Sequence, residues 1–473
     1  MRIALLLIAA CAADVSAIEQ QLAAPGSCAT FAVPDDGVDD RAAIQSAIDT
    51  QGCADLSSGT YDVIVTSPRT GSRYDLLTLT GGRTLRGAGP ATVIRFSGDA
   101  ARSDLRGIGM TGDSNLVADL TLDTTGLTNT EEQTHAIQIT GPALNQRVSG
   151  NWFRHPSLGA SAGGDCIKVV GYDQTATTPD MRVSMVITGN VFAQCDRSGV
   201  AVHSGLRDAL INSNLFLETG DQDIDLEGSG GAIDSLVISG NSFRRTLNNG
   251  VSVAIAAGLT RRAVFSGNIV NGGRLFTYNV ERLSVTGNVF TVPWQAIEMV
   301  KMTKEVVIAG NAFAGTDDTA TAGMMISATH HNSGMPGMVS ITGNTFRAAN
   351  PLGLFVAVTS AESVSIANNS FTWSPAAAPA GRVAALAYGL VRPTEAIAFT
   401  NNIVTGPYAR TLMVTNSYEA SSGGGIRAVT FAGNILRGPA AGLLCQNPGP
   451  GPYVSYGNSG APHQCFAAIT GGL

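Results

Sequence analysis

One short phrase recurs along most of this sequence. In most copies, apolar residues alternate with other residues, Gly-Asn follows, and an apolar residue comes shortly after the Asn. Val148–Phe153 and Val186–Phe192 are examples. The Asn of the eleven copies lies at positions 151, 190, 214, 241, 268, 288, 311, 344, 369, 402 and 434. Their mean spacing is about 28 residues, and self-similarity at such a period indicates a stack of equivalent units.

The composition of each unit indicates strands. Val, Ile and Phe alternate over short segments, and helical periodicity does not separate them. A four-stranded propeller blade needs ~40 residues or more, whereas three short strands fit a unit of this length. The sequence therefore predicts an all-β parallel β-helix of about 11 to 13 coils. Gly and Asn tolerate the positive φ of tight corners, which accounts for most of the 56 glycines, and stacked Asn amides satisfy polar groups in the core.

The N-terminal segment resembles a secretion signal. Arg2 supplies a positive start, Ile3–Ala10 an apolar stretch and Val15-Ser16-Ala17 a cleavage site, so residues 1–17 are predicted to be a signal peptide. The segment before Cys11 also fits a lipoprotein box that would lipidate this residue. The apolar stretch is too short to span a bilayer, and we expect a secreted, periplasmic or extracellular protein with no membrane span.

Further boundaries follow from the repeat. Residues 18–60 are expected to form an N-terminal cap with one amphipathic helix at about 40–50, begun by Asp39 or Asp40 and ended by Gly52. Such a helix can cover the open end of a solenoid. The β-helix is predicted at 61–440 and a C-terminal cap at 441–473.

Six cysteines follow Cys11, and an even number in an exported chain suggests disulfides. The proposed pairs are Cys28–Cys53, Cys445–Cys465 and Cys166–Cys195, with buried free thiols as the alternative.

Several segments near the N-terminus resemble the entry to right-handed β-helices of the pectate-lyase superfamily. They are Asp35–Asp40, the helix that follows, Ser58–Tyr61 and Leu85–Gly89. The resemblance implies a single-domain right-handed β-helix. The superfamily includes lyases, glycoside hydrolases, epimerases, tailspikes and surface proteins, so the fold alone does not select a reaction. Trimers occur among related folds, and a homotrimer remains open.

The segment Gly220–Gly228 concentrates acidic residues. Asp223, Asp225 and Glu227 alternate with apolar residues, so we expect all three to point outward from one strand. Positions two residues apart lie roughly 6.5–7 Å apart, within the ~5–9.5 Å that separates catalytic carboxylates in glycosidases. Mutual repulsion raises the pKa of at least one carboxyl group, as a general acid requires. The alternatives are a solvated face and a calcium site.

Neighbouring strands are expected to leave room beside these acids. Small residues occupy the matching outward positions at Gly199, Ala201, Gly250, Ser252 and Ala254. His203 is expected one coil from Glu227, where it would tune that carboxylate, and Lys168 two coils from Asp225, as a base or a charge neutraliser. Both are assigned to the predicted catalytic set, with an ordinary surface role as the alternative.

Other residues are candidates for sugar binding. Arg244, Tyr278 and Glu298 are predicted to bind substrate, and the stacking candidates are Tyr172, Phe276, Tyr278 and Trp294. Ordinary packing is the alternative for each aromatic residue. His330-His331 lies in a predicted loop without further ligands at a suitable spacing, so we do not predict a metal site there.

Gly164-Asp165-Cys166-Ile167 partly resembles the Asp-Asp-Cys-Ile motif of polygalacturonase-type hydrolases. The first Asp is replaced by Gly164, and the family's Gly-His-Gly and Arg-Ile-Lys elements have no fitting counterpart. This departure argues against polygalacturonase activity, and Asp165 is equally suited to cap the turn before a strand.

The overall charge narrows the choice of partners. A formal net charge of −7 disfavours non-specific nucleic-acid binding. The resulting hypothesis is an exported glycoside hydrolase that cleaves a polysaccharide without a cofactor. One alternative is a lyase that acts on a uronic-acid polymer, with calcium at Asp223, Asp225 and Glu227. The other is a non-catalytic carbohydrate-binding or surface β-helix.

Overall fold

A computed structural model provides the structure. It describes residues 28, 30–65, 74–99, 105–128, 134–154, 164–170, 183–203, 205–227, 232–245, 250–256, 258–292, 295–301, 304–315, 324–329, 337–348, 354–359, 361–373, 383–389, 394–406, 410–416, 426–438, 442–446 and 453–460.

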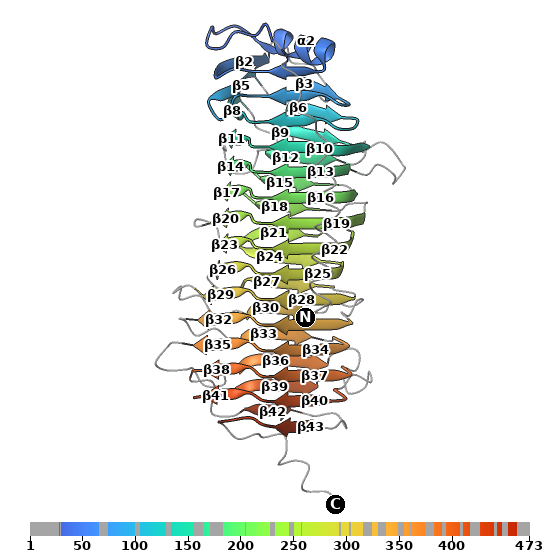
Figure 1. Ribbon diagram of the computed structural model, residues 1–473, viewed down its shortest axis with the longest axis vertical. Coiled ribbons are helices and arrows are strands. Elements are labelled where there is room, and N and C mark those ends of the chain that lie inside the picture. The colour runs from blue at the N-terminus through green and yellow to red at the C-terminus, as the bar shows by residue number, and fades with distance from the viewer. Residues whose placement is uncertain are drawn as a thin grey trace, which may run out of the picture. The chain divides into compact units, whose positions relative to one another are not determined.

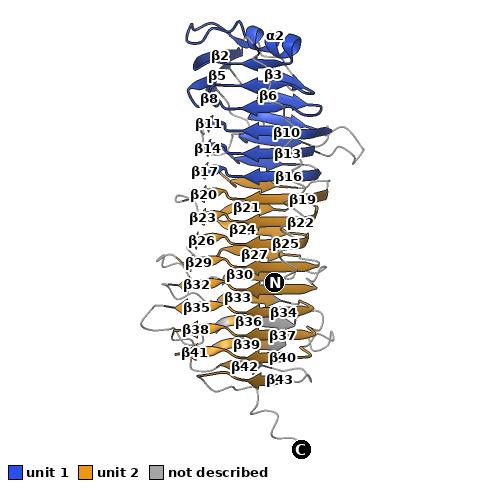
Figure 2. Ribbon diagram, in the orientation of Figure 1, with its two compact units in different colours: residues 1–215 blue, residues 216–473 orange. Residues whose placement is uncertain are grey.

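The chain forms two compact units, residues 1–215 and 216–473, called unit 1 and unit 2 below (Figure 2). In each unit the chain winds through three short strands per coil, and equivalent strands of successive coils pair in parallel (Figure 1). Three parallel sheets result, which confirms the predicted right-handed parallel β-helix.

Unit 1 contains the first strands of each sheet. Its first sheet is β1 (Cys53–Asp55), β4 (Thr84–Arg86), β7 (Leu116–Ala118), β10 (Ala143–Ser149), β13 (Val183–Thr188) and β16 (Leu206–Asn212). Its second sheet is β2 (Gly59–Val65), β5 (Thr92–Asp99), β8 (Thr121–Thr128), β11 (Trp152–Arg154) and β14 (Val191–Ala193). Its third sheet is β3 (Tyr74–Thr80), β6 (Leu105–Thr111), β9 (His135–Thr140), β12 (Ile167–Val170) and β15 (Val200–Val202). Strand β17 (Leu215–Leu217) includes the unit boundary.

Unit 2 repeats this order. Its first sheet is β19 (Ala232–Ser239), β22 (Leu259–Ser266), β25 (Val280–Thr286), β28 (Glu305–Ala309), β31 (Met338–Thr342), β34 (Ser363–Ala367), β37 (Ala396–Thr400), β40 (Val429–Ala432) and β43 (Tyr453–Tyr456). Its second sheet is β20 (Ser242–Arg244), β23 (Ile269–Asn271), β26 (Val289–Val292), β29 (Ala312–Gly315), β32 (Thr345–Ala348), β35 (Ser370–Trp373), β38 (Ile403–Thr405) and β41 (Ile435–Arg437). Its third sheet is β18 (Ile224–Leu226), β21 (Val251–Ile255), β24 (Arg274–Tyr278), β27 (Ile297–Val300), β30 (Met324–Thr329), β33 (Leu354–Thr359), β36 (Val383–Gly389), β39 (Arg410–Asn416) and β42 (Leu443–Gln446).

The recurrent Asn forms a buried amide ladder inside each unit. In unit 1 the side chain of Asn151 donates to Asn190 at 3.1 Å, and in unit 2 that of Asn241 donates to Asn268 at 3.0 Å. The preceding glycine adopts positive φ at several corners, as at Gly267 (+62°). The phenylalanines of the same phrase stack in the core, with Phe346 and Phe371 at 4.7 Å between ring centroids. The repeat therefore supplies both the corner geometry and much of the packing.

The first coils are built without this corner. The described residues form sheets of 15, 14 and 14 strands, somewhat more than the expected 11 to 13 coils. Three additional strands of the first sheet, β1, β4 and β7, lie within residues 53–128, which carry no copy of the Gly-Asn phrase, and a fourth, β43, follows the last of the eleven copies. The eleven copies therefore counted only the coils between these strands.

The predicted N-terminal helix is present as α2 (Arg41–Gln51). Asp40 is its N-cap residue, and Gly52 ends it in the left-handed conformation, with its N–H bonded to the Ile48 carbonyl at 3.1 Å. Ile44 and Ile48 are buried on one face. The helix thus packs its apolar face against the first coils.

Two of the three predicted disulfides are present, Cys28–Cys53 and Cys166–Cys195, with Cα–Cα distances of 5.6 and 5.7 Å. The third prediction involves Cys465, and the signal-peptide and lipidation predictions involve residues 1–17; all lie outside the described residues. Within the described part of the chain, no helix has the length and hydrophobicity needed to cross a membrane.

Candidate functional site

The acidic segment of unit 2 surrounds a very short strand. Strand β18 spans only Ile224–Leu226, so Asp223 precedes it and Glu227 follows it. Ile224 and Leu226 are buried in the core, and alternation directs Asp225 to the outer face of the third sheet. Asp225 is nevertheless only 2% exposed, whereas Glu227 is exposed. The outer face thus holds one nearly buried and one exposed carboxylate.

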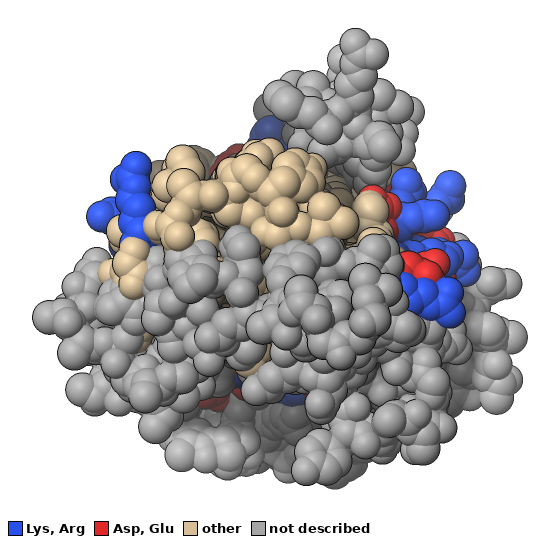
Figure 3. Space-filling view, turned by 90° about the horizontal axis from the view of Figure 1, so that it is seen from below, with Lys and Arg blue, Asp and Glu red and all other residues tan. Residues whose placement is uncertain are grey.

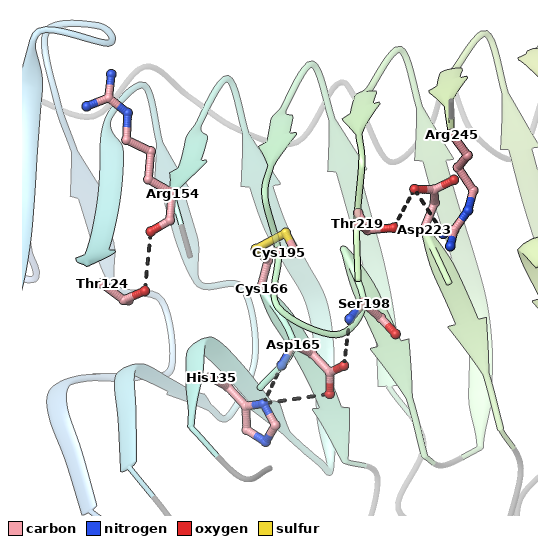
Figure 4. Close-up of a disulfide and its surroundings, with 10 residues drawn as sticks. All are labelled: Thr124, His135, Arg154, Asp165, Cys166, Cys195, Ser198, Thr219, Asp223 and Arg245. Carbon is pink, nitrogen blue, oxygen red and sulfur yellow. Dashed lines mark hydrogen bonds and ion pairs between the residues drawn. A yellow bond between two sulfur atoms is a disulfide. The ribbon is translucent and has the colours of Figure 1, made fainter. Parts of the chain in front are cut away.

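Asp223 differs from the expectation of a third outward-facing acid. Its carboxylate Oδ1 accepts a hydrogen bond from the Thr219 hydroxyl at 2.6 Å and lies 3.8 Å from Arg245 Nη1 (Figure 4). Arg245 Nη1 also donates to the Thr219 hydroxyl at 3.0 Å. Asp223 and Arg245 are 0% and 1% exposed. Asp223 therefore belongs to a buried polar cluster at the corner before β18.

Burial controls the ionisation of Asp223. It raises the pKa of this carboxyl group to about 6, because the loss of hydration outweighs the opposing effects of Arg245, Thr219 and Ser252. Asp223 is therefore a carboxyl group that exchanges a proton near neutral pH but has no direct exposure to a ligand.

Asp223 does not suit the calcium alternative. A calcium site needs six to eight oxygen ligands, and the Asp223 carboxylate already contacts a guanidinium group and a hydroxyl donor. A bound Ca²⁺ at Asp223 would lie beside the positive charge of Arg245. Carboxylate oxygens of Asp225 and Glu227 lie within 4.8 Å of each other, and calcium at these two acids stays an alternative.

Small side chains adjoin the acids on the next strand. Asp225 pairs in register with Ala254 of β21, which pairs with Phe276 of β24. The expected small residues Ser252 and Ala254 are thus both on β21, and both are buried. Because parallel strands lie ~4.8 Å apart, about 9–10 Å separates the backbones of β18 and β24. On the outer face of the third sheet, the short side chains of β21 therefore lie between the acidic strand β18 and the aromatic strand β24.

The predicted substrate-binding residues divide between two sheets. Tyr278 is 38% exposed at the end of β24, with Lys301 Nζ 5.5 Å from its ring centroid. Glu298 of β27 forms an ion pair with Arg274 at 3.3 Å. Arg244 lies on β20 of the second sheet, so it faces a different side of unit 2. Tyr172, Trp294 and His330-His331 lie outside the described residues.

Lys168 in unit 1 belongs to a second buried cluster. It projects from β12, is 4% exposed and lies 3.2 Å from Asp165 Oδ2. His135 Nδ1 lies 3.6 Å from the same oxygen and accepts a hydrogen bond from the Asp165 backbone N–H at 3.0 Å (Figure 4). That bond indicates a neutral imidazole with its proton on Nε2. The Asp165 carboxylate accepts from the Ser198 backbone N–H of the next coil at 3.2 Å, so this bond links two coils and does not cap the turn before β12.

Cations dominate the ionisation of Asp165. Burial opposes its charge, but Lys168 and Arg197 hold the pKa of this carboxyl group below its ordinary value. His203 lies just after β15, half-buried, and its backbone N–H donates to the Val169 carbonyl at 2.9 Å. It belongs to unit 1 and Glu227 to unit 2, and their pairing stays a prediction.

Sequence reasoning did not identify Thr219 and Arg245 as partners of Asp223. The signal for them is weak: each follows a corner Asn by four or five residues, at Asn214 and Asn241. Aligning the coils on that Asn places Thr219, Asp223 and Arg245 at neighbouring corners. His135 likewise carries no local motif and reaches Asp165 only through coil stacking.

The chain was also compared with known proteins. Neither a family model nor a curated protein matches it. Among solved structures, the A-module of the Azotobacter vinelandii mannuronan C-5 epimerase AlgE6 has 17% identity and a TM-score of 0.44, over 92% of this chain and 98% of that chain. The catalytic unit of a GH87 α-1,3-glucanase from Streptomyces thermodiastaticus has 15% identity and a TM-score of 0.35, over 93% and 70%. The tailspike protein of E. coli bacteriophage HK620 has 14% identity and a TM-score of 0.42, over 87% and 76%. At these values the likeness does not extend to individual residues or to an activity.

Proposed function

We propose that this chain is an exported enzyme that cleaves a polysaccharide by glycoside hydrolysis, with Asp225 and Glu227 as its catalytic pair. The observation that supports the proposal is the position of both carboxylates on one outer face, beside the small side chain of Ala254. A sugar chain lying over Ala254 would meet the acids on one side and the aromatic residues of β24 on the other. The two disulfides fit an oxidising compartment.

The two acids suit different roles. Carboxylate oxygens of Asp225 and Glu227 lie within 4.8 Å of each other, which is closer to the ~5–5.5 Å of retaining enzymes than to the ~6.5–9.5 Å of inverting ones. Glu227 is exposed and has the longer side chain, so we assign it the protonation of the glycosidic oxygen. Asp225 would then activate water or attack the sugar. Arg245 and Thr219 do not contact the sugar in this scheme; they hold the corner from which β18 starts.

Conservative substitutions test the pair. We expect Asp225→Asn and Glu227→Gln each to lower the turnover number by ~10²-fold or more, with unchanged circular dichroism. Asp234→Asn, which alters an acid on β19 of the first sheet, serves as the matched control and should retain full activity. Full activity in both site variants would exclude this mechanism.

The products formed with azide then distinguish the roles of Asp225 and Glu227. In Asp225→Ala, added azide can attack the sugar in place of the missing carboxylate and give a glycosyl azide of inverted configuration, whereas in Glu227→Ala azide that attacks a glycosyl-enzyme intermediate gives a product of retained configuration. An inverted azide product from the Glu227 variant and a retained one from the Asp225 variant would reverse the assignment.

A polysaccharide panel separates hydrolysis from elimination. New reducing ends without ultraviolet-absorbing products support hydrolysis, and unsaturated products indicate the lyase alternative. That alternative needs a base, and Lys168 is ion-paired and nearly buried, which is why we rank it second. Binding of a polysaccharide without any product would indicate the non-catalytic alternative.

A further inference from the structure

The described strands of the second sheet in unit 2 carry basic residues and no acids. Its eight strands, β20 to β41, contain three charged residues, Arg244, Arg347 and Arg437, and all three are exposed. Their neighbours Phe243, Phe346 and Leu436 are buried in the core, so alternation directs each arginine outward.

Strand register places the three arginines in one column. The paired positions run through Arg244, Asn271, Thr291, Ala314, Arg347, Thr372, Thr405 and Arg437. We call this column the arginine strip. Amide and hydroxyl groups occupy four of the five positions between the arginines, so hydrogen-bonding groups continue along the strip.

Several charges on the other faces of unit 2 are paired. On the first sheet Arg261 lies 3.0 Å from Asp234, and Lys304 lies 2.7 Å from Glu281 at the start of β25. By contrast, Arg244, Arg347 and Arg437 form no ion pair with any described residue. In Figure 3, blue and red atoms adjoin at the right, and the blue atoms at the left lie beside tan and grey atoms. The left is the side on which Figure 1 draws the second sheet.

Two exposed apolar pairs lie beside the arginine strip. Ile269 and Val289 pair in register and are 54% and 44% exposed, and Ile403 and Ile435 are 39% and 38% exposed. These residues lie two positions before the arginine strip on the same outer face, and Ala, Thr and Ser separate the two pairs. At each pair, apolar side chains next to hydrogen-bond donors match the two sides of a sugar ring, which has C–H faces and hydroxyl edges.

The spacing of the arginines indicates the shape of the ligand. Four strand steps separate Arg244 from Arg347 and three separate Arg347 from Arg437, or ~19 Å and ~14 Å at ~4.8 Å per step. Both spans exceed the Debye length of ~8 Å at physiological salt, so each arginine attracts a charge independently. A ligand that meets all three must be extended and must carry anionic groups at intervals.

We propose that the arginine strip binds a linear anionic polysaccharide, whose carboxylate or sulfate groups pair with Arg244, Arg347 and Arg437. Guanidinium groups bind both types of oxyanion through paired hydrogen bonds. This site is separate from the acids of β18 and does not depend on the proposed hydrolysis. It would hold the enzyme on a charged polymer while the third sheet acts on its own substrate.

Binding measurements on the full chain test the proposal. The probes are polygalacturonate and dextran sulfate, with neutral dextran and poly-glutamate for comparison, by affinity electrophoresis at roughly 0.02 and 0.15 M salt. Substitution of Arg244, Arg347 and Arg437 by Gln should weaken binding of the anionic polysaccharides by ~10-fold or more. The control substitutes three arginines of the first sheet, Arg261, Arg262 and Arg282, by Gln. It removes the same charge and should change binding by less than ~2-fold.

Each outcome of these binding measurements either supports or overturns the proposal. Loss confined to the strip variant supports the proposal. Equal binding by the strip variant and wild type, or an equal loss in the control, overturns it. Poly-glutamate binding as tight as polysaccharide binding also overturns it, in favour of an acidic polypeptide. Turnover by the Asp225 and Glu227 site on a short neutral oligosaccharide should be the same in both triple variants, so a failure of the proposed hydrolysis is recognised separately.

Discussion

Asp165 of unit 1 and Asp223 of unit 2 occupy comparable places with opposite ionisation. Each precedes a third-sheet strand, β12 or β18, and each is 0% exposed. Burial opposes the charge of both carboxylates, yet the pKa is lowered for Asp165 and raised to about 6 for Asp223. The difference lies in their cations, because Lys168 is 3.2 Å from Asp165 and Arg245 is 3.8 Å from Asp223.

The number of cations strengthens the contrast. Lys168 and Arg197 both favour the charged form of Asp165. The main cation near Asp223 is Arg245, and the negative charge of Glu218 opposes the ionisation of Asp223. A buried aspartate is therefore ionised when two cations share its carboxylate and becomes a proton-binding group when one guanidinium serves it at longer range.

Removing Lys168 should produce the largest effect on stability. Lys168→Met leaves the Asp165 charge buried without its closest cation, so we expect a loss of about 3–5 kcal/mol in the free energy of unfolding. The shift of the urea midpoint, followed by circular dichroism, measures this loss. The double variant with Asp165→Asn should recover much of it, because the buried charge is then absent. A double variant as unstable as the sum of both single variants would mean that the pair does not interact.

The Cys166–Cys195 disulfide should come next. Cys166 directly follows Asp165, and the bond closes a segment of 29 residues. Replacing both cysteines by Ser should cost about 2–4 kcal/mol, mainly through the greater freedom of the unfolded chain. The comparison is the urea midpoint of wild type and variant, each with and without reductant. Reductant should destabilise the variant less than the wild type; an equal effect would indicate that only the Cys28–Cys53 bond contributes.

Asp223 should make stability fall as the pH rises. Its pKa is about 6 in the folded chain against an ordinary 3.8, so the folded state retains a proton that the unfolded chain releases. The stabilising contribution is complete below about pH 4 and is lost by about pH 6, a change of about 3 kcal/mol. Unfolding midpoints between pH 4 and 7 should therefore fall less steeply in Asp223→Asn than in wild type.

Asp165→Asn provides the opposite control. Because the pKa of Asp165 is lowered, its contribution is present above the ordinary value of 3.8 and is lost as the pH falls further. The difference between wild type and this variant should thus shrink only at acidic pH. Parallel pH curves for wild type and Asp223→Asn would refute the raised pKa.

The fold follows from the sequence more directly than the site does. The Asn at position 151 and its successors repeat one corner, and each fulfils the same role in the amide ladder. Alternation along β18 likewise predicts that Asp225 and Glu227 share a face. The first inference needs only neighbours in sequence and is confirmed, whereas the alternation that gives the second also predicts Asp223 on the same face, where the structure buries it instead.

Contacts between coils explain what sequence reasoning missed. Asp223 is buried because Thr219 and Arg245 meet it from neighbouring corners. Arg244 and Arg245 adjoin in sequence, yet the first is an exposed strand residue and the second is buried at the corner. A shift of one position therefore decides which arginine reaches Asp223. The strand register, rather than the composition of the segment, sets this contact.

The exposed pair Lys304–Glu281 should show the smallest effect. Its Nζ–Oε2 distance of 2.7 Å is shorter than that of Lys168–Asp165, but the lysine side chain is 51% exposed. The hydrogen bond to Lys304 lowers the pKa of Glu281, while water screens the attraction. We expect Lys304→Met to cost only about 0.2–1 kcal/mol, and the loss to shrink in high salt. The same urea experiment compares it with Lys168→Met. A loss in Lys304→Met as large as that in Lys168→Met would show that distance, rather than burial, governs the ion pairs of this chain.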